Sequence, residues 1–138
     1  MRAGNKIVLV GNPNVGKSVM FGLLTNKYVT VSNYPGTTVE VSYGDMAIDN
    51  KSYLVVDTPG VNSMVPMSED EKVTRDIFLQ EEPLAVVQVA DTKNLKRSLL
   101  ITLQIAEMEL PAILVLNMED EARDRGIVVD INHLKTLI

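Results

Sequence analysis

The chain contains no cysteine and only one histidine. The absence of cysteine excludes a disulfide framework, a thiolate metal site and a cysteine nucleophile within this chain. A single histidine excludes a metal site built from several histidines. Long apolar runs are also lacking: the longest, residues 112–116, is far shorter than the roughly 20 residues of a membrane-spanning helix. The short apolar segment at residues 7–10 is insufficient for the core of a signal peptide.

An excess of positive charge is absent as well. Thirteen basic and eighteen acidic side chains give a net charge of −5, and no run of lysine or arginine occurs. General nucleic-acid binding requires clustered basic residues, so no nucleic-acid partner is expected. The remaining composition, 46% apolar and 22% charged over 138 residues, is typical of one folded domain. We therefore expect a soluble, cytoplasmic domain.

Short apolar runs alternate with polar turns and helix-like segments, a pattern that predicts a mainly parallel α/β sheet. Strands are expected at residues 7–10, 38–48, 52–57, 84–90 and 112–116, the second and third forming an antiparallel hairpin through residues 49–51. Helices are expected at residues 18–25, about 69–80, 94–108 and from Asp130 onward. Residues 27–37 contain Asn33, Pro35 and Gly36 without a clear period, so they are interpreted as a loop.

Residue patterns also predict how the helices begin and which faces they bury. Ser68 and Glu71 form a capping-box pattern at the start of the second helix. Side chains expected to face the core are, in the first helix, Met20, Phe21, Leu23 and Leu24, and in the third, Leu95, Leu99, Leu103 and Ala106.

The strongest chemical signal is a phosphate-loop pattern, G-x-x-x-x-G-K-[ST]. It is fitted by Gly11, Asn12, Pro13, Asn14, Val15, Gly16, Lys17 and Ser18. The glycines allow successive backbone N–H groups to turn toward phosphates, and the following helix presents its positive end. Lys17 is expected to contact the β- and γ-phosphates, and Ser18 to bind Mg²⁺. A chance glycine-rich turn is the alternative, but the motif lies between an expected strand and an expected helix, as a phosphate loop must.

A second motif, Asp57-Thr58-Pro59-Gly60, follows the third expected strand. Asp57 could hold Mg²⁺ through water, and the backbone N–H of Gly60 could donate to a γ-phosphate. Without a phosphate loop, this pattern would be an ordinary turn.

A third motif, Asn117-Met118-Glu119-Asp120, follows the last expected strand. Asp120 could accept two hydrogen bonds from the N1–H and the N2 amino group of guanine, which adenine cannot match. Asn117 and Met118 complete the predicted base site. A helix cap formed by asparagine or aspartate is the alternative for this motif alone.

Thr37 and Thr38 lie between the first helix and the second strand. One hydroxyl could bind Mg²⁺ only when a γ-phosphate is present, which would make this loop a switch. We assign Thr38, with Thr37 as the alternative; two β-branched residues starting a strand would look the same. Together the motifs predict a guanine-nucleotide switch domain, with Lys17, Thr38 and Gly60 among its catalytic residues.

With these motifs, the chain resembles the amino-terminal G domain of the ferrous iron transport protein B (FeoB) family. Residues 11–18, 33–40 and 57–60 match the first three motifs of that family, and the more specific similarities are residues 68–76, 89–95 and 116–122. The resemblance implies a Ras-like P-loop GTPase domain that binds GTP and GDP. It also implies a longer transporter of ferrous iron, whose helical and membrane-spanning regions follow a cytoplasmic domain at the inner (plasma) membrane.

Members of the family continue with a sixth strand, a Ser/Thr-Ala loop that contacts the base, and a final helix. Residues 1–138 are therefore expected to form a G domain that is incomplete at its C-terminus, lacking the last strand and helix. Residues 112–116 would then be an unprotected sheet edge, so self-association and weaker nucleotide binding are expected.

The resemblance also bears on catalysis. Ras-like enzymes use a glutamine after D-x-x-G to orient the attacking water, whereas this chain has Val61, so slow hydrolysis is expected. Asn14 resembles the catalytic asparagine of the potassium-activated branch and is expected to bind K⁺; alternatively, it only tolerates an unusual backbone conformation. Arg2, Arg75 and Arg97 stay open as sources of an arginine finger.

The predicted function is slow, K⁺-stimulated GTP hydrolysis that regulates ferrous iron uptake. One alternative is an Era-type GTPase of RNA biology, which the acidic charge and residues 68–76 disfavour. Another is a nucleotide-dependent interaction module without useful hydrolysis. His133 is interpreted as a solvated helix residue, and residues 69–71 as a charged helix start rather than an iron site. Tyr34 could cover either the nucleotide or a loop.

Overall fold

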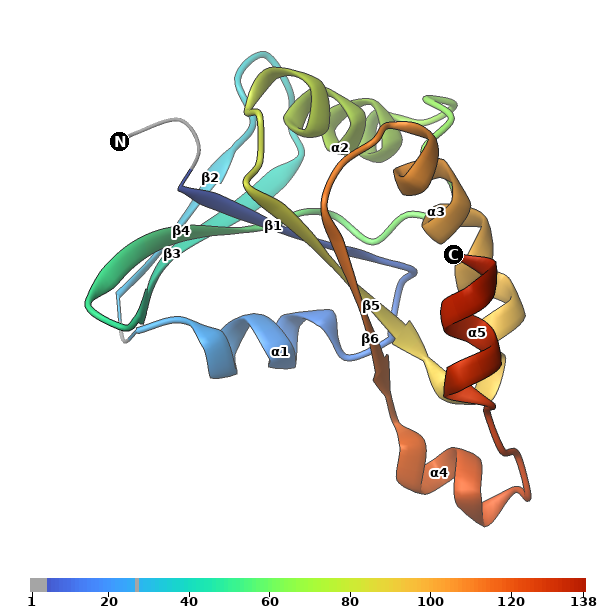
Figure 1. Ribbon diagram of the computed structural model, residues 1–138. Helices are drawn as coiled ribbons and strands as arrows, with labels where there is room; N and C mark the ends of the chain where they lie inside the picture. Colours follow the sequence, from blue (N-terminus) through green and yellow to red (C-terminus); the bar gives the residue numbers. More distant parts are fainter. Residues whose placement is uncertain (1–4, 27) are drawn as a thin grey trace.

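One mixed sheet organises the computed structural model, which describes residues 5–26 and 28–138. Its strands are β1 (Lys6–Gly11), β2 (Val29–Asn33), β3 (Glu40–Ile48), β4 (Lys51–Asp57), β5 (Ala85–Asp91) and β6 (Ala112–Asn117). They lie in the order β2-β3-β4-β1-β5-β6 (Figure 1). β1 pairs in parallel with β4 and β5, and β5 with β6, whereas β3 is antiparallel to both β2 and β4. The mainly parallel sheet with its β3–β4 hairpin confirms the predicted fold class.

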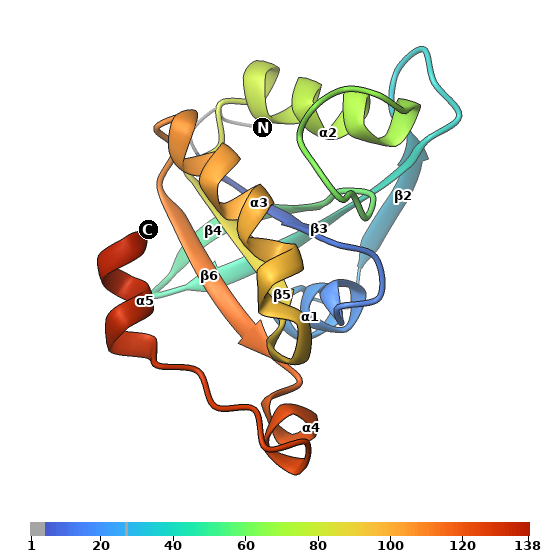
Figure 2. The same ribbon diagram turned by 90° about the vertical axis from the view of Figure 1, so that its right-hand side faces the viewer.

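Helices cover both faces of this sheet (Figures 1 and 2). α1 (Lys17–Leu24) lies on one face, while α2 (Glu69–Gln80) and α3 (Leu95–Glu107) lie on the other. A 3-10 turn, η1 (Thr92–Asn94), leads into α3. Two short helices, α4 (Glu119–Asp124) and α5 (Ile131–Leu137), follow β6, and α5 lies beside that strand.

The central strand β1 shows why the apolar runs are continuous. Val8, Leu9 and Val10 are all fully buried, because a parallel strand covered by helices on both faces has no solvent side. Leu9 packs with Phe21 on the face that α1 covers. Val8 and Val10 pack with Ile77 of α2 and other residues of a larger cluster on the opposite face. The two clusters hold β1 rigidly, and β1 leads directly into the phosphate-loop pattern.

The phosphate-loop pattern and the second and third motifs each follow a parallel strand. β1, β4 and β6 end at Gly11, Asp57 and Asn117. The register pairs Leu9 with Asp57 in β1–β4, and Gly11 with Val89 in β1–β5. Because carboxyl ends of parallel strands meet at one edge of a sheet, the three motifs are brought to the same side of the molecule.

The loop predicted at residues 27–37 is wrong in part. Val29–Asn33 forms β2, which pairs antiparallel with β3, while Lys27 lies outside the described residues. Val29, Thr30 and Val31 are β-branched and favour a strand, and the two valines alternate with Thr30 and Ser32 along it. Of the turn residues that favoured a loop, Asn33 is the last residue of β2, and Pro35 and Gly36 follow it.

The predicted helix faces are also partly wrong. Phe21 is buried as expected, but Leu23 is 78% exposed and Leu103 is 50% exposed. The residues that α3 buries are Ser98, Ile101 and Ile105. The hydrogen-bonding needs of Gln88, buried in β5, set the rotation of α3: its Nε2 donates to the Ser98 carbonyl at 2.8 Å, and its Oε1 accepts from Thr102 Oγ1 at 2.6 Å.

Several local predictions are confirmed. Ser68 and Glu71 form the capping box that starts α2. Asp49 and Asn50 form the hairpin turn with φ values of 49° and 66°, a left-handed conformation that these residue types tolerate. Asp130 caps α5, and His133 is exposed. α4 was not predicted as an element.

β6 is at the edge of the sheet, as expected for residues 112–116. The run is not covered on both faces, because Ile113 is 57% exposed. In the part of the chain that the structure describes, every helix is too short or too polar to cross a lipid bilayer.

Candidate functional site

The loop between β1 and α1 is held in a conformation that requires glycine. Gly16, the residue before α1, has a φ of 89°, in the left-handed region. A Cβ atom there would also clash with the side-chain amide of Asn117. A Cβ on Gly11 would come within 2.5 Å of the Val89 carbonyl oxygen. The two glycines of the pattern therefore allow the loop to pack closely against β5 and the end of β6.

A cavity of about 520 Å³ lies over this loop. Its lining residues come from the loop itself, the start of α1, the end of the second motif and the first turn of α2: Asn12, Pro13, Asn14, Gly16, Lys17, Ser18, Val19, Gly60 and Asp70. Orphan backbone N–H groups and the dipole at the amino end of α1 make this an anion-binding position. The cavity therefore suits phosphate groups, and it contains most of the predicted phosphate-contacting residues.

Lys17 links the loop to the second motif. Its Nζ donates to Asp57 Oδ1 and to the Thr58 carbonyl oxygen. The two charged side chains are only 8% and 13% exposed. Thr58 is itself fixed, because its Oγ1 donates to the Leu9 carbonyl at 2.6 Å. Phosphates that take up the Lys17 ammonium would compete with Asp57 for it, and would leave the carboxylate available to a cation.

Gly60 packs directly on the phosphate loop. A Cβ atom at Gly60 would lie 2.9 Å from Pro13 Cα, so a larger residue would push the two motifs apart. The next backbone N–H, of Val61, donates to the Gly11 carbonyl at 3.0 Å. The Val61 side chain is 2% exposed and belongs to the core cluster. It therefore cannot orient a water in the cavity, which agrees with the expectation drawn from its chemistry.

Asn117 joins the third motif to the phosphate loop. Its Nδ2 donates to the Val15 carbonyl at 2.9 Å, across 102 positions of sequence. Met118, with a φ of 58°, turns the chain into α4, whose exposed first turn carries Asp120. The structure thus brings Asn117 against the loop and leaves the Asp120 carboxylate accessible beyond it.

The candidate switch threonines are not in the cavity over the loop. The Thr37 hydroxyl donates to the Tyr34 carbonyl at 2.9 Å and accepts from the Val39 N–H at 3.1 Å, while Thr38 is exposed. Tyr34 is partly buried and packs against the core cluster of the α2–α3 face. Burial, followed by the nearby Asp76 carboxylate, raises the pKa of Tyr34.

Asn14 has a φ of 63°, in the left-handed region that asparagine tolerates better than most residues. It also lines the cavity. The backbone conformation agrees with the structural alternative for this residue, and the location agrees with the cation-binding one.

The side chains present fit Mg²⁺ bound together with phosphates. In residues 5–26 and 28–138, no group of three or more His, Cys, Asp or Glu side chains could hold a metal ion by itself. Mg²⁺ commonly uses one or two protein oxygens and completes its shell with phosphate and water. Ser18 lines the cavity and offers its hydroxyl oxygen. Asp57 offers a carboxylate oxygen, and its hydrogen bond from Lys17 holds it next to the same loop.

Arg75 and Arg97, considered as possible arginine fingers, do not line the cavity over the phosphate loop. Arg75 donates to the Met64 carbonyl at 3.4 Å, and Arg97 donates to Asn62 Oδ1 at 2.8 Å. Both thereby hold the segment after the second motif, and Arg2 lies outside the described residues. Asp70, which lines the cavity, was interpreted only as part of a charged helix start. Asp70 comes near the loop because of how α2 packs against the rest of the fold, and no local sequence pattern predicts that packing.

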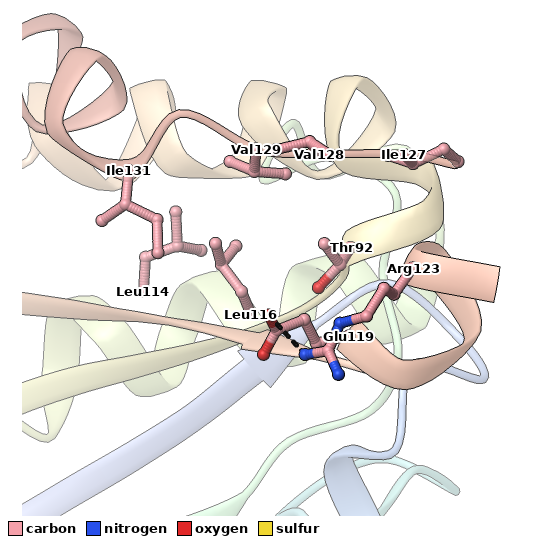
Figure 3. Close-up of a pocket in the computed structure, with 9 residues that line it drawn as sticks. All are labelled: Thr92, Leu114, Leu116, Glu119, Arg123, Ile127, Val128, Val129 and Ile131. Atoms are coloured by element: carbon pink, nitrogen blue, oxygen red, sulfur yellow. Dashed lines mark hydrogen bonds and ion pairs between the residues drawn. The ribbon is translucent and has the colours of Figure 1, made fainter. Parts of the chain in front are cut away.

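A second cavity, of about 380 Å³, lies between β6, α4 and the segment leading to α5 (Figure 3). Its walls are mainly apolar, with an ion pair at 3.1 Å between Glu119 and Arg123. Thr92 of η1 also lines it, and the Thr92 hydroxyl donates to the Asn117 carbonyl at 2.6 Å. None of the residues predicted to bind nucleotide lines this cavity.

Comparisons with known proteins agree on one family. A family model described as ferrous iron transport protein B matches residues 5–138. The Fe(2+) transporter FeoB of Methanocaldococcus jannaschii is 45% identical over 103 residues, which are 75% of this chain and 15% of that relative. The chain therefore spans less than a fifth of the length of this curated relative.

Two solved structures show the same arrangement. The cytosolic domain of L. pneumophila FeoB has a TM-score of 0.91 at 37% identity, covering 96% of this chain and 53% of that one. A GDP form of the cytosolic domain of the T. maritima FeoB iron transporter has a TM-score of 0.89 at 38% identity, covering 95% and 52%. The chain is thus similar to about half of each of these domains.

Proposed function

Because the chain belongs to the ferrous iron transport protein B family, we propose that it is a GTP-binding domain that hydrolyses GTP slowly and regulates ferrous iron uptake. The observation that carries the proposal is the hydrogen bond from the Asn117 amide to the Val15 carbonyl. It fixes the predicted base-reading segment against the phosphate loop, so one nucleotide could span both.

At the phosphate end, backbone N–H groups of the loop, from residues other than Pro13, would surround the β-phosphate, and the positive end of α1 would face it. Lys17 transfers its ammonium from Asp57 and the Thr58 carbonyl to the β- and γ-phosphates. Gly60 packs on Pro13 and would donate its N–H to the γ-phosphate. These steps position charge before any bond is broken, which is the main requirement of phosphoryl transfer.

Ser18, Asp57 and Thr38 would hold Mg²⁺, with Asp57 acting through water. When bound, Mg²⁺ neutralises charge on the β- and γ-phosphates. Thr38 is exposed and would have to approach the cavity, so its contact would depend on the γ-phosphate and distinguish GTP from GDP. Asn14, which lines the cavity, would contribute its amide oxygen to K⁺.

Slow hydrolysis follows from what surrounds the γ-phosphate position. Val61 is buried in the core, so the side chain after D-x-x-G cannot orient the attacking water. Arg75 and Arg97 are engaged with the segment after that motif. Positive charge near the transferring phosphoryl group would therefore come from Lys17 and from K⁺ at Asn14.

At the other end, Asp120 accepts hydrogen bonds from the N1–H and N2 amino group of guanine, with Asn117 and Met118 beside it. An adenine base would leave this carboxylate unpaired, which gives the site its selectivity for guanine.

The partners are those of a transporter. Since the M. jannaschii relative is a Fe(2+) transporter of much greater length, we propose that this domain works on the cytoplasmic side of the inner membrane, together with helical and membrane-spanning regions. Nucleotide state in this domain would control iron passage elsewhere in the protein. Family membership and the net charge of −5 both disfavour the RNA-biology alternative.

Phosphate release from GTP tests the proposal. We expect slow turnover of GTP that is faster in K⁺ than in Na⁺ and much weaker turnover of ATP. Lys17→Ala should abolish it, whereas Lys51→Ala, in an exposed part of the β3–β4 hairpin, should not. Tight GTP binding without any turnover would favour the interaction-module alternative instead.

A further inference from the structure

η1 packs against the predicted base-reading segment, Asn117 to Asp120. The register of β5 and β6 places Asp91 next to Asn117, so the turn after β5 adjoins the turn after β6. Thr92, 4% exposed, donates its hydroxyl to the Asn117 carbonyl at 2.6 Å. This bond fixes the backbone at the first residue of the segment.

Lys93, the next residue of η1, makes three side-chain contacts. Its Nζ lies 3.0 Å from Asp91 Oδ1, 3.3 Å from Met118 Sδ and 3.4 Å from Glu121 Oε2. Asp91 also caps η1, because its Oδ1 accepts from the Lys93 backbone N–H at 2.9 Å. The Lys93 side chain is only 13% exposed, which is low for a lysine. The hydrogen bond to Asp91 raises the pKa of Lys93 above its ordinary value.

Two of the side chains that Lys93 contacts, Met118 and Glu121, lie on either side of Asp120, the predicted base-binding residue, in the sequence. Met118 has a φ of 58° and no side-chain hydrogen bond caps the start of α4. The first turn carries three carboxylates in succession, of which Glu119 pairs with Arg123 at 3.1 Å within the helix, while Asp120 and Glu121 make no such pair inside it. Packing at the start of α4 therefore depends on contacts from outside the helix, and an ammonium between Met118 and Glu121 supplies them.

We propose that Lys93 is a positioning residue for guanine recognition, holding Met118 and Glu121 so that the Asp120 carboxylate faces the N1–H and N2 amino group of the base. This inference rests on the proposed function, because it assigns base recognition to Asp120. Lys93 itself does not touch the base in this account. Its effect is on selectivity, with the phosphate contacts left intact.

The test measures the dissociation constants of GDP and IDP for the 138-residue chain with Mg²⁺. IDP carries a guanine-like base without the 2-amino group, so the ratio of the two constants reports one of the two bonds to Asp120. Lys93→Met retains the aliphatic stem and removes the ammonium. We expect it to weaken GDP binding about tenfold and IDP binding much less, so that the ratio falls toward one.

Two variants accompany it. Lys93→Arg retains a cation and should restore most of the ratio. Lys96→Met makes the same chemical change on the exposed side of α3 and should leave the ratio unchanged. A circular-dichroism melt of each variant shows whether the fold is retained.

Equal weakening of GDP and IDP by Lys93→Met, or an unchanged ratio, would overturn the positioning role while leaving the proposed function intact. If the unmodified chain bound GDP no better than ADP, guanine recognition itself would fail, and this inference would fail with it.

Discussion

At the residue scale, Asn14 illustrates how one position satisfies two explanations. Its φ of 63° is a conformation that glycine also adopts easily, whereas its side-chain oxygen is a possible cation ligand. A substitution can separate the two. Asn14→Gly retains the backbone preference and removes the amide, and Asn14→Ala removes both.

We expect Asn14→Gly to bind GDP normally but to lose the difference in GTP turnover between K⁺ and Na⁺. Asn14→Ala should lose the difference as well and be less stable, because alanine is strained at positive φ. Phosphate release in each salt, with a thermal melt of both variants, provides the measurement. Retention of K⁺ stimulation in Asn14→Gly would show that Asn14 serves the backbone alone.

The two neighbouring threonines make a second residue-scale prediction. The Thr37 hydroxyl is occupied by the turn from Tyr34 to Val39, so it is the poorer candidate for Mg²⁺. Thr38→Ala should weaken the Mg²⁺ dependence of binding for a non-hydrolysable GTP analogue and leave that of GDP unchanged. Thr37→Ala should lower thermal stability instead. The opposite assignment of these effects would transfer the switch role to Thr37.

At the scale of elements, Tyr34 and Tyr43 attach the segment after β2 and the strand β3 to the core cluster. Burial raises the pKa of both phenols above 10.0, with the Asp76 carboxylate adding to the effect at Tyr34 and Glu81 at Tyr43. The unfolded chain releases these protons at lower pH than the folded chain does. This contribution to stability is therefore present below pH 10 and is lost as the pH rises through the folded-state values.

We expect Tyr34→Phe, which removes the ionisable group, to move the midpoint of alkaline unfolding to higher pH. Tyr28→Phe changes a residue that is 82% exposed and provides the control. Fluorescence or circular dichroism recorded against pH would give the midpoint of alkaline unfolding for each chain. Identical midpoints for Tyr34→Phe and the unmodified chain would mean that another group limits alkaline stability.

The elements also show how far sequence reasoning extends. Continuous apolar runs identified β1, β5 and β6, and Ser68 with Glu71 located the start of α2, because these signals are local. β2 was missed although Val29 and Val31 alternate with polar residues, because this short run adjoins Pro35 and Gly36, which favour a turn; in the structure it is a fully exposed edge strand. The face of α3 depended on the hydrogen bonds of Gln88, a partner ten or more positions away.

The candidate site divides in the same way. Gly11, Lys17, Asp57 and Asn117 were found because each follows or precedes a recognisable strand or helix. Asp70 and Lys93 were not, since their positions depend on how α2 and η1 pack rather than on any motif.

At the scale of the whole molecule, the open edge of β6 matters. This strand is apolar and has no charged residue to discourage pairing with another chain. Ile113 is 57% exposed on it, while α5 lies beside Leu114 and Leu116. The other edge, β2, exposes Val31 to a similar degree, 56%.

We expect the chain to self-associate through β6 as its concentration rises. Ile113→Lys should reduce the association seen by light scattering, and Val31→Lys, on the opposite edge, should not. A chain that stays monomeric, or one that only Val31→Lys disperses, would contradict this assignment.

The central claim about this molecule is that a single nucleotide spans the phosphate loop and the Asn117–Asp120 segment. Isothermal titration of the chain with GDP and with ADP, both with Mg²⁺, tests this most directly. A hydrogen bond to a charged group contributes about 1.5–3 kcal/mol, so two of them predict a preference for GDP of at least about a hundredfold. Asp120→Ala should erase that preference, and Asp124→Ala, exposed on the same helix, should retain it. Equal affinity for GDP and ADP in the unmodified chain, or an undiminished preference in Asp120→Ala, would contradict the account.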